Sequence, residues 1–285
     1  MNARDAVLIS AGELMRQLDG GEQPAILDVR WRLDKPDGNA DYLAGHIPGA
    51  VYVSLEDELT DHGRPGRGRH PLPSGGELQI AARRWGVKAN QPLVVYDDWN
   101  RAGSARAWWV LTAVGISDVR ILDGGLSAWT DAGGALQRGA STSRLGDVSV
   151  LHDDLYVGGR ATLTAEQVSG PGVSTLLDAR APERFRGEVE PVDPVAGHIP
   201  GARNLPSTTV LAEDGTFLPE AGLIALFEQT AVGHSDTVAV YCGSGITASV
   251  VLAALSATGI NAALFPGSWS QWSSEPDRPV ALGCG

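Results

Sequence analysis

Residues 237–260 read TVAVYCGSGITASVVLAALSATGI, a strand, a tight loop and a helix in direct succession. The apolar run 238–241 has the length and β-branched content of a buried strand. Gly, Ser and Thr dominate 243–247, and apolar residues then continue through 259 with no strand-like alternation. A continuous apolar strand followed by a helix is typical of a parallel sheet covered by helices on both faces, so this stretch predicts an α/β fold.

The loop that follows this strand begins at Cys242. Unpaired backbone N–H groups at a loop and helix N-terminus point towards such a position, and the helix dipole adds positive potential. A site of this kind lowers a cysteine pKa from about 8.5 to roughly 3.5–7.5. Gly243, Ser244 and Gly245 suit a turn that gathers N–H groups around an anion. The alternative is an inert buried cysteine, but the loop composition favours a reactive thiolate.

The chain contains two copies of one pattern. AILDVR (25–30) corresponds to TLLDAR (175–180), and AGHIPGA occurs at both 44–50 and 196–202. PLVVYDDWNRAGSARAWWVLTAVGI (92–116) then parallels the opening stretch. Because order and spacing are kept, we predict two tandem domains, each a parallel sheet flanked by helices. The predicted boundaries are 1–138 for the first domain, 139–159 for a linker rich in Ser, Gly and Asp, and 160–285 for the second.

The two copies differ where the chemistry is expected. The second has Cys242 after its strand, whereas the first has Asp97 and a longer loop. We therefore predict that only the second domain carries a nucleophile.

Composition sets further limits. The formal net charge is −12, from 22 basic and 34 acidic residues, which disfavours nucleic acid or a membrane surface as a partner. There is no apolar run of membrane-spanning length and no secretory signal pattern at the N-terminus. Two cysteines form no disulfide framework or zinc cluster, so we expect a cytoplasmic protein without a metal site.

Taken together, the tandem copies, the GHIPGA motifs, LDVR, LDAR and the single cysteine loop resemble the two-domain rhodanese family of thiosulfate and 3-mercaptopyruvate sulfurtransferases. The resemblance implies an active site at the domain interface and a cysteine that takes a sulfane sulfur from a small anionic donor. The resulting persulfide would pass sulfur to cyanide or a thiol, including a protein thiol. No cofactor is implied.

The loop sequence bears on the donor. CGSGIT is similar to the loop of the mercaptopyruvate enzymes, with Ile246 in place of Val, and it lacks the Arg and Lys typical of the thiosulfate enzymes. A keto acid could be polarised by the hydroxyls of Ser244 and Thr247, although Thr247 could equally cap the following helix. The resemblance implies that 243–247 contact the substrate.

Two arginines of the second domain match family positions. Arg184 corresponds to the arginine that faces the cysteine and binds the donor anion, and Arg186 corresponds to another nearby. A further arginine of the mercaptopyruvate enzymes would fall near EPVDP, where this chain has Val192 and Asp193. The resemblance therefore does not decide between the two donors.

The segment DHGRPGRGRHPLPS (61–74) gathers three arginines, Arg64, Arg67 and Arg69, in a Gly- and Pro-rich loop. Such a loop can attract anionic donors locally despite the acidic net charge. His70 resembles the family histidine that reaches the active cleft, and Glu56 falls near the position of its acidic partner.

Other prominent residues are expected to be structural. His46 and His198 occur in both GHIPGA motifs, including the copy without a cysteine, so they favour a core or turn role. Trp108, Trp109 and Trp129 are expected to pack. Asp28 and Asp178 end strands and are expected to orient loop backbone or a neighbouring arginine.

The sequence argues against one alternative function and leaves another open. A cysteine phosphatase of related fold needs an arginine six positions after the cysteine, but Ala248 and Ser249 stand there. A sulfur carrier or protein-interaction module that does not turn over stays open, because persulfide carriage is chemically continuous with sulfur transfer.

Overall fold

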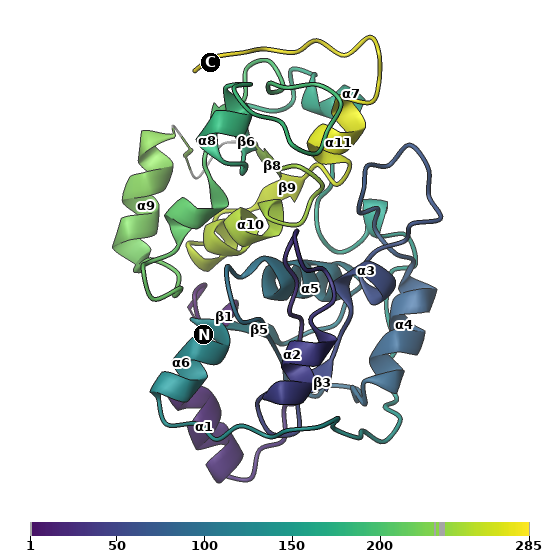
Figure 1. Cartoon of the computed structure of the whole chain (residues 1–285), viewed down its shortest axis with the longest axis vertical. Coiled ribbons are helices and arrows are strands. Elements are labelled where there is room, and N and C mark those ends of the chain that lie inside the picture. Colours follow the sequence, from purple (N-terminus) through teal and green to yellow (C-terminus); the bar gives the residue numbers. More distant parts are fainter. Residues whose placement is uncertain (1, 231, 234–236, 285) are drawn as a thin grey trace. The chain divides into compact units, whose positions relative to one another are not determined.

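The computed structural model describes residues 2–230, 232–233 and 237–284, and the chain divides into two compact units (Figure 1). The first comprises 1–61, 72–160 and 212–217. The second comprises 62–71, 161–211 and 218–285. Each unit contains one parallel sheet with helices packed against it, which confirms the predicted α/β fold.

The sheet of the first unit has the strand order β1-β5-β4-β2-β3, and all its pairings are parallel. Its strands are β1 (Leu8–Ile9), β2 (Ala25–Asp28), β3 (Val51–Tyr52), β4 (Leu93–Tyr96) and β5 (Val119–Leu122). Its helices are α1 (Ala11–Asp19), α2 (Asn39–Ala44), α3 (Leu55–Glu58), α4 (Gly75–Arg84), α5 (Ala102–Ala113), α6 (Gly125–Asp131) and the 3₁₀ turn η1 (Leu155–Val157).

The sheet of the second unit has the order β7-β6-β8-β9, again parallel throughout. Its strands are β6 (Thr175–Asp178), β7 (Arg203–Asn204), β8 (Val238–Tyr241) and β9 (Ala262–Leu264). Its helices are α7 (Ala165–Val168), α8 (Pro182–Phe185), the 3₁₀ turn η2 (Ser207–Val210), α9 (Glu220–Gln229), α10 (Ala248–Ala257) and α11 (Ser268–Trp272).

The repeated motifs occupy equivalent positions in the two sheets. Asp28 pairs in register with Tyr96, and Asp178 pairs in register with Tyr241. Each tyrosine hydroxyl accepts a hydrogen bond at 3.1 Å from the isoleucine N–H of its own GHIPGA motif. The sequence repeat is therefore also a repeat of tertiary contacts.

Both strand-ending aspartates hold arginines, as predicted. Arg30 donates to Asp28 and Arg180 donates to Asp178, and all four side chains are almost fully buried. In the second unit, Arg180 Nη2 also donates to the carbonyl of Gly197 at 2.7 Å. A buried ion pair thus connects the end of β6 to the GHIPGA turn.

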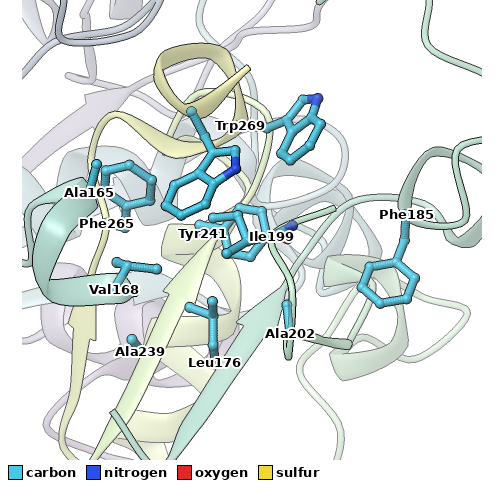
Figure 2. Packing of buried hydrophobic residues seen from close by; sticks show 11 residues of the cluster. Ala165, Val168, Leu176, Phe185, Ile199, Ala202, Ala239, Tyr241, Phe265 and Trp269 are labelled. Atoms are coloured by element: carbon cyan, nitrogen blue, oxygen red, sulfur yellow. Dashed lines mark hydrogen bonds between the residues drawn. The ribbon is translucent and has the colours of Figure 1, made fainter. Parts of the chain in front are cut away.

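One core cluster of the second unit consists of aromatic and aliphatic side chains on one face of the sheet (Figure 2). Tyr241 and Leu176 from the strands pack with Trp269 of α11 and Val168 of α7. Because side chains alternate along a strand, Val238 and Val240 lie on the opposite face of the sheet from Tyr241. Helix α10 packs against β8 and β9.

The histidines and tryptophans singled out above are buried. His46 and His198 are completely inaccessible, and each ring stacks on an aromatic neighbour and hydrogen-bonds a backbone carbonyl through Nδ1. Trp108, Trp109 and Trp129 are buried in or at the ends of α5 and α6. Their predicted structural role is confirmed.

Two connecting segments belong to units that could not be assigned from their positions in the chain. The predicted linker, 139–159, belongs to the first unit, where Leu155 is buried and Gly75 N donates to the carbonyl of Asp153. The arginine-rich segment 62–71 belongs to the second unit. The domain boundaries drawn from the sequence stay a prediction.

Within the described residues, no helix combines the length and apolar character needed to cross a lipid bilayer.

Candidate active site

Cys242 lies immediately after β8, at the carboxyl end of a central strand of the second sheet. Its Sγ accepts a hydrogen bond from Gly245 N at 3.1 Å, and its own N–H donates to Ser268 Oγ at 3.2 Å. The residue is 2% exposed. Open parallel sheets bind ligands at the carboxyl ends of their strands, and Cys242 lies at such an end.

The turn that directs the N–H of Gly245 towards Cys242 Sγ requires a glycine at this position. Its φ is +82°, in the left-handed region, and a Cβ there would lie 2.8 Å from the carbonyl oxygen of Pro266. The start of α11 fixes the other side of the loop, because Trp269 N and Ser270 N donate to the carbonyls of Cys242 and Gly243. The backbone around the sulfur is therefore held by two neighbouring segments.

The remaining loop residues have distinct environments. Ile246 is 1% exposed and packs in the core. Thr247 occupies the N-cap position of α10, but its side chain makes no capping hydrogen bond, so the structure does not support the alternative capping role. Ser244 is buried, and its Oγ lies 2.7 Å from Nδ1 of His70.

His70 reaches Ser244 because segment 62–71 packs directly on the start of α11. A Cβ at Gly68, whose φ is +82°, would lie 2.5 Å from the carbonyl oxygen of Gly267. Arg69 N donates to Ser270 Oγ at 3.0 Å. These two contacts place the imidazole of His70 beside the hydroxyl of the cysteine loop.

Two guanidinium groups lie over the same loop. A Cβ on Gly243 would be 3.1 Å from Nη2 of Arg69 and 3.6 Å from Nη1 of Arg184. Arg184 comes from the last turn of α8, and Arg69 comes from segment 62–71. The predicted Arg184 therefore does lie at the cysteine loop, with Arg69 as a second cation beside it.

Two buried carboxylates pair with these arginines. Glu190 Oε1 accepts from Arg184 Nη2 at 2.6 Å, and Asp193 accepts from both Arg184, at 3.3 Å, and Arg69. Burial raises the pKa of Glu190, but hydrogen bonds from Arg184 and from the N–H of Asp193 outweigh it and leave the pKa below 4.5. Burial raises the pKa of Asp193 above 3.8 despite the nearby arginines, and the charge of Glu190 adds to this increase.

Two predicted site residues have other surroundings. Arg186 pairs with the exposed Glu188 at 2.7 Å. Glu56 lies in the first unit, where it accepts a hydrogen bond from Nε1 of Trp31 at 2.6 Å.

The equivalent loop of the first unit is occupied by a carboxylate. Asp97 Oδ1 accepts from the backbone N–H of Trp99 and Arg101, and Oδ2 accepts from the N–H and hydroxyl of Ser104 at 3.0 and 2.6 Å. The first copy thus keeps a turn with inward N–H groups and fills it with its own anion. Asp97 therefore occupies the place that Cys242 has in the second copy.

Among the residues that the structure describes, no group of three or more His, Cys, Asp and Glu side chains is arranged to hold a metal ion.

The sequence profile of the Rhodanese-like domain matches the chain twice, at residues 10–132 and 161–275. The chain belongs to the rhodanese-like family. Known members resemble it over nearly its full length. A protein of Mycobacterium tuberculosis named "Putative thiosulfate sulfurtransferase SseB" is 64% identical over 283 residues, which cover 99% of both chains. A "Probable 3-mercaptopyruvate sulfurtransferase" of Pseudomonas aeruginosa is 46% identical over 98% of this chain and 99% of its own.

Solved structures of rhodanese-like enzymes agree with this assignment. The crystal structure of the 3-mercaptopyruvate sulfurtransferase SseA from Escherichia coli superposes with a TM-score of 0.80 at 34% identity, covering 92% of this chain and 98% of that one. The protein is therefore a sulfurtransferase of the thiosulfate and 3-mercaptopyruvate type, and the family resemblance inferred from the sequence is confirmed.

Sequence reasoning missed the carboxylates of this rhodanese-like site. The sequence pattern gives no site role to Glu190, and it marks Asp193 only as a departure near the place where the resemblance expects an arginine. The pattern EVEPVD, acidic residues shortly after Arg184, was the available signal, since buried arginines need anionic partners.

Proposed function

We propose that the protein transfers sulfane sulfur from a small anionic donor to cyanide or a thiol through a persulfide on Cys242. The observation that carries this proposal is the hydrogen bond from Gly245 N to the sulfur at the end of β8. The same N–H group can stabilise a thiolate before transfer and a persulfide anion after it. One fixed turn would then serve both halves of the cycle.

The electron balance of the first half-reaction depends on the donor. With thiosulfate, the Cys242 thiolate attacks the sulfane sulfur, the donor S–S bond breaks and sulfite leaves with the electron pair. With 3-mercaptopyruvate, the C–S bond breaks, and pyruvate leaves as its enolate, which takes up a proton. In the second half-reaction, cyanide or a thiolate attacks the outer sulfur and Cys242 leaves as the thiolate again.

The surrounding side chains suit these steps. Arg184 and Arg69 would bind the donor anion, because guanidinium N–H groups match carboxylate and sulfonate oxygens. The Ser244 hydroxyl, with His70 at 2.7 Å, would donate to the carbonyl or enolate oxygen of a keto acid. Gly243, Gly245, Ile246 and Thr247 complete the loop. Substrate-binding roles for Arg186 and Glu56 stay predictions from the resemblance.

Both donors have support. The Ser244–His70 pair favours a keto acid, as does the relative in Pseudomonas aeruginosa. The relative in Mycobacterium tuberculosis is named for thiosulfate. We therefore propose that both are substrates. The predicted cytoplasmic location would keep both cysteines, Cys242 and Cys284, as free thiols.

Initial-rate kinetics test this function. Thiocyanate formation from each donor and cyanide should give parallel double-reciprocal lines, because the sulfur is held covalently between two half-reactions. Cys242→Ser should abolish turnover, and Cys284→Ser, a matched change at an exposed cysteine, should keep it.

Full activity in Cys242→Ser would contradict the proposal. If Cys242 is loaded but neither cyanide nor a small thiol unloads it, the turnover part of the proposal fails and a carrier role replaces it.

A further inference from the structure

Arginines and carboxylates pair with one another beside the cysteine loop. Arg69 and Arg184 lie over Gly243, and Asp193 and Glu190 pair with them. The side chains of both carboxylates are nearly inaccessible, at 3% and 4% exposure. A donor anion therefore meets guanidinium groups that already pair with carboxylates of the protein, one of which, Glu190, also accepts from Arg180 Nη1 at 3.3 Å.

Asp193 has the geometry of a bound anion. One carboxylate oxygen accepts from Nη1 of Arg69, and the other accepts from Nη2 of Arg184 at 3.3 Å. A carboxylate that bridges two guanidinium groups beside the cysteine loop mimics a carboxylate or sulfonate substrate. Among the described residues, no hydrogen bond engages Nη2 of Arg69, the atom nearest the Gly243 Cβ position.

The local backbone holds Asp193 in this place. Glu190 Oε1 accepts hydrogen bonds from Val192 N and Asp193 N, each at 3.1 Å, and so closes the turn 190–193. The stretch near which the resemblance expects an arginine thus carries a fixed carboxylate. The second guanidinium comes instead from Arg69 in segment 62–71.

We propose that Asp193 is a specificity-determining residue, an internal anion that competes with the donor for Arg69 and Arg184. It weakens the binding of anionic donors and penalises dianions more than monoanions. The proposal rests on the function proposed above and identifies the residue that sets the balance between thiosulfate and 3-mercaptopyruvate.

The expected effect of Asp193→Asn follows from charge. The variant keeps one oxygen as an acceptor for arginine and removes one negative charge. Coulomb energy scales with the product of the charges, so the gain in rate for a dianion is about the square of the gain for a monoanion. If loading by monoanionic 3-mercaptopyruvate rises roughly fivefold, loading by dianionic thiosulfate rises roughly 25-fold. The selectivity ratio, which is the loading rate with thiosulfate divided by the loading rate with 3-mercaptopyruvate, then rises roughly fivefold.

The test measures second-order rates of Cys242 persulfide formation in single turnovers, with each donor below saturation and at low salt. Glu188→Gln is the matched control, since it removes the same charge from an exposed ion pair with Arg186. We expect the selectivity ratio to rise roughly fivefold in Asp193→Asn and by less than about 1.5-fold in Glu188→Gln, with salt reducing the difference.

An unchanged ratio in a folded Asp193→Asn variant, or an equal change in Glu188→Gln, would overturn the inference while leaving the proposed function intact. Failure of the wild-type protein to load with either donor would instead overturn the proposed function. Should Asp193→Asn not fold, Arg69→Gln tests the same arrangement from its other side. Its ratio should fall roughly fivefold, and no fall would overturn the inference.

Discussion

The turn at Gly245 offers the sharpest prediction about how the chain activates its cysteine. Gly245→Ala places a methyl group on a residue with φ of +82°, and its Cβ would lie 2.8 Å from the carbonyl oxygen of Pro266. The left-handed conformation costs an alanine about 1–2 kcal/mol, and the contact with a backbone oxygen adds to this. The loop must shift, which moves the N–H away from Cys242 Sγ.

The loss of activity can be worked out from that single hydrogen bond. A hydrogen bond to a charged group contributes about 1.5–3 kcal/mol, so losing it from an anionic sulfur should slow persulfide formation by roughly 10- to 150-fold. Rapid-quench mass spectrometry of the Cys242 peptide measures this rate directly. Urea unfolding of the same variant measures the strain.

Gly201→Ala separates strain from chemistry. Gly201 has a nearly identical φ of +83°, but no atom lies within 4 Å of its Cβ position. We expect this control to lose about 1–2 kcal/mol of stability and to load sulfur at the wild-type rate. Wild-type loading by Gly245→Ala would refute the claim that this turn activates the sulfur.

Three further predictions concern the polar groups around the loop. Ser244→Ala should lower kcat for 3-mercaptopyruvate by roughly 10- to 100-fold and affect thiosulfate much less, because only the keto acid needs a hydrogen bond at its oxygen; equal losses in steady-state assays would contradict this. Arg184→Lys should raise KM for either donor by roughly tenfold, since lysine cannot donate in a bidentate manner; an unchanged KM would exclude Arg184 from donor binding. Glu190→Gln should destabilise the protein near neutral pH, because the lowered pKa of Glu190 means that its charged form stabilises the fold above pH 4.5. That stabilisation is lost as the pH falls through the folded pKa, so urea unfolding should show the difference shrinking below pH 4.5, and a constant difference would count against it.

Much of the fold could be predicted because local pattern and tertiary environment agree. Both faces of the sheets are covered, so strands such as 93–96 and 238–241 are continuous apolar runs. The repeat then placed Asp28 and Asp178 at equivalent strand ends, where the structure finds both holding buried arginines. Cys242 could be placed at the carboxyl end of a strand because a predicted strand precedes its loop and a predicted helix follows it.

The neighbours of the cysteine were harder to predict because they come from distant segments. Nothing in the sequence near Arg69 shows that it pairs with Asp193, which lies 124 residues away. Thr247 stands at a helix start and suits a cap by residue type, yet the loop orients its side chain without a capping bond. Such contacts depend on how segment 62–71 and the turn 190–193 pack, which no periodicity encodes.

The central claim is that Cys242 carries the transferred sulfur, and peptide mass spectrometry after incubation with each donor tests it most directly. We expect one added sulfur atom on the peptide that contains Cys242, none on the peptide that contains Cys284, and loss of the added sulfur as thiocyanate when cyanide is supplied. A Cys242 peptide of unchanged mass, in protein that still forms thiocyanate from the same donor, would contradict the account.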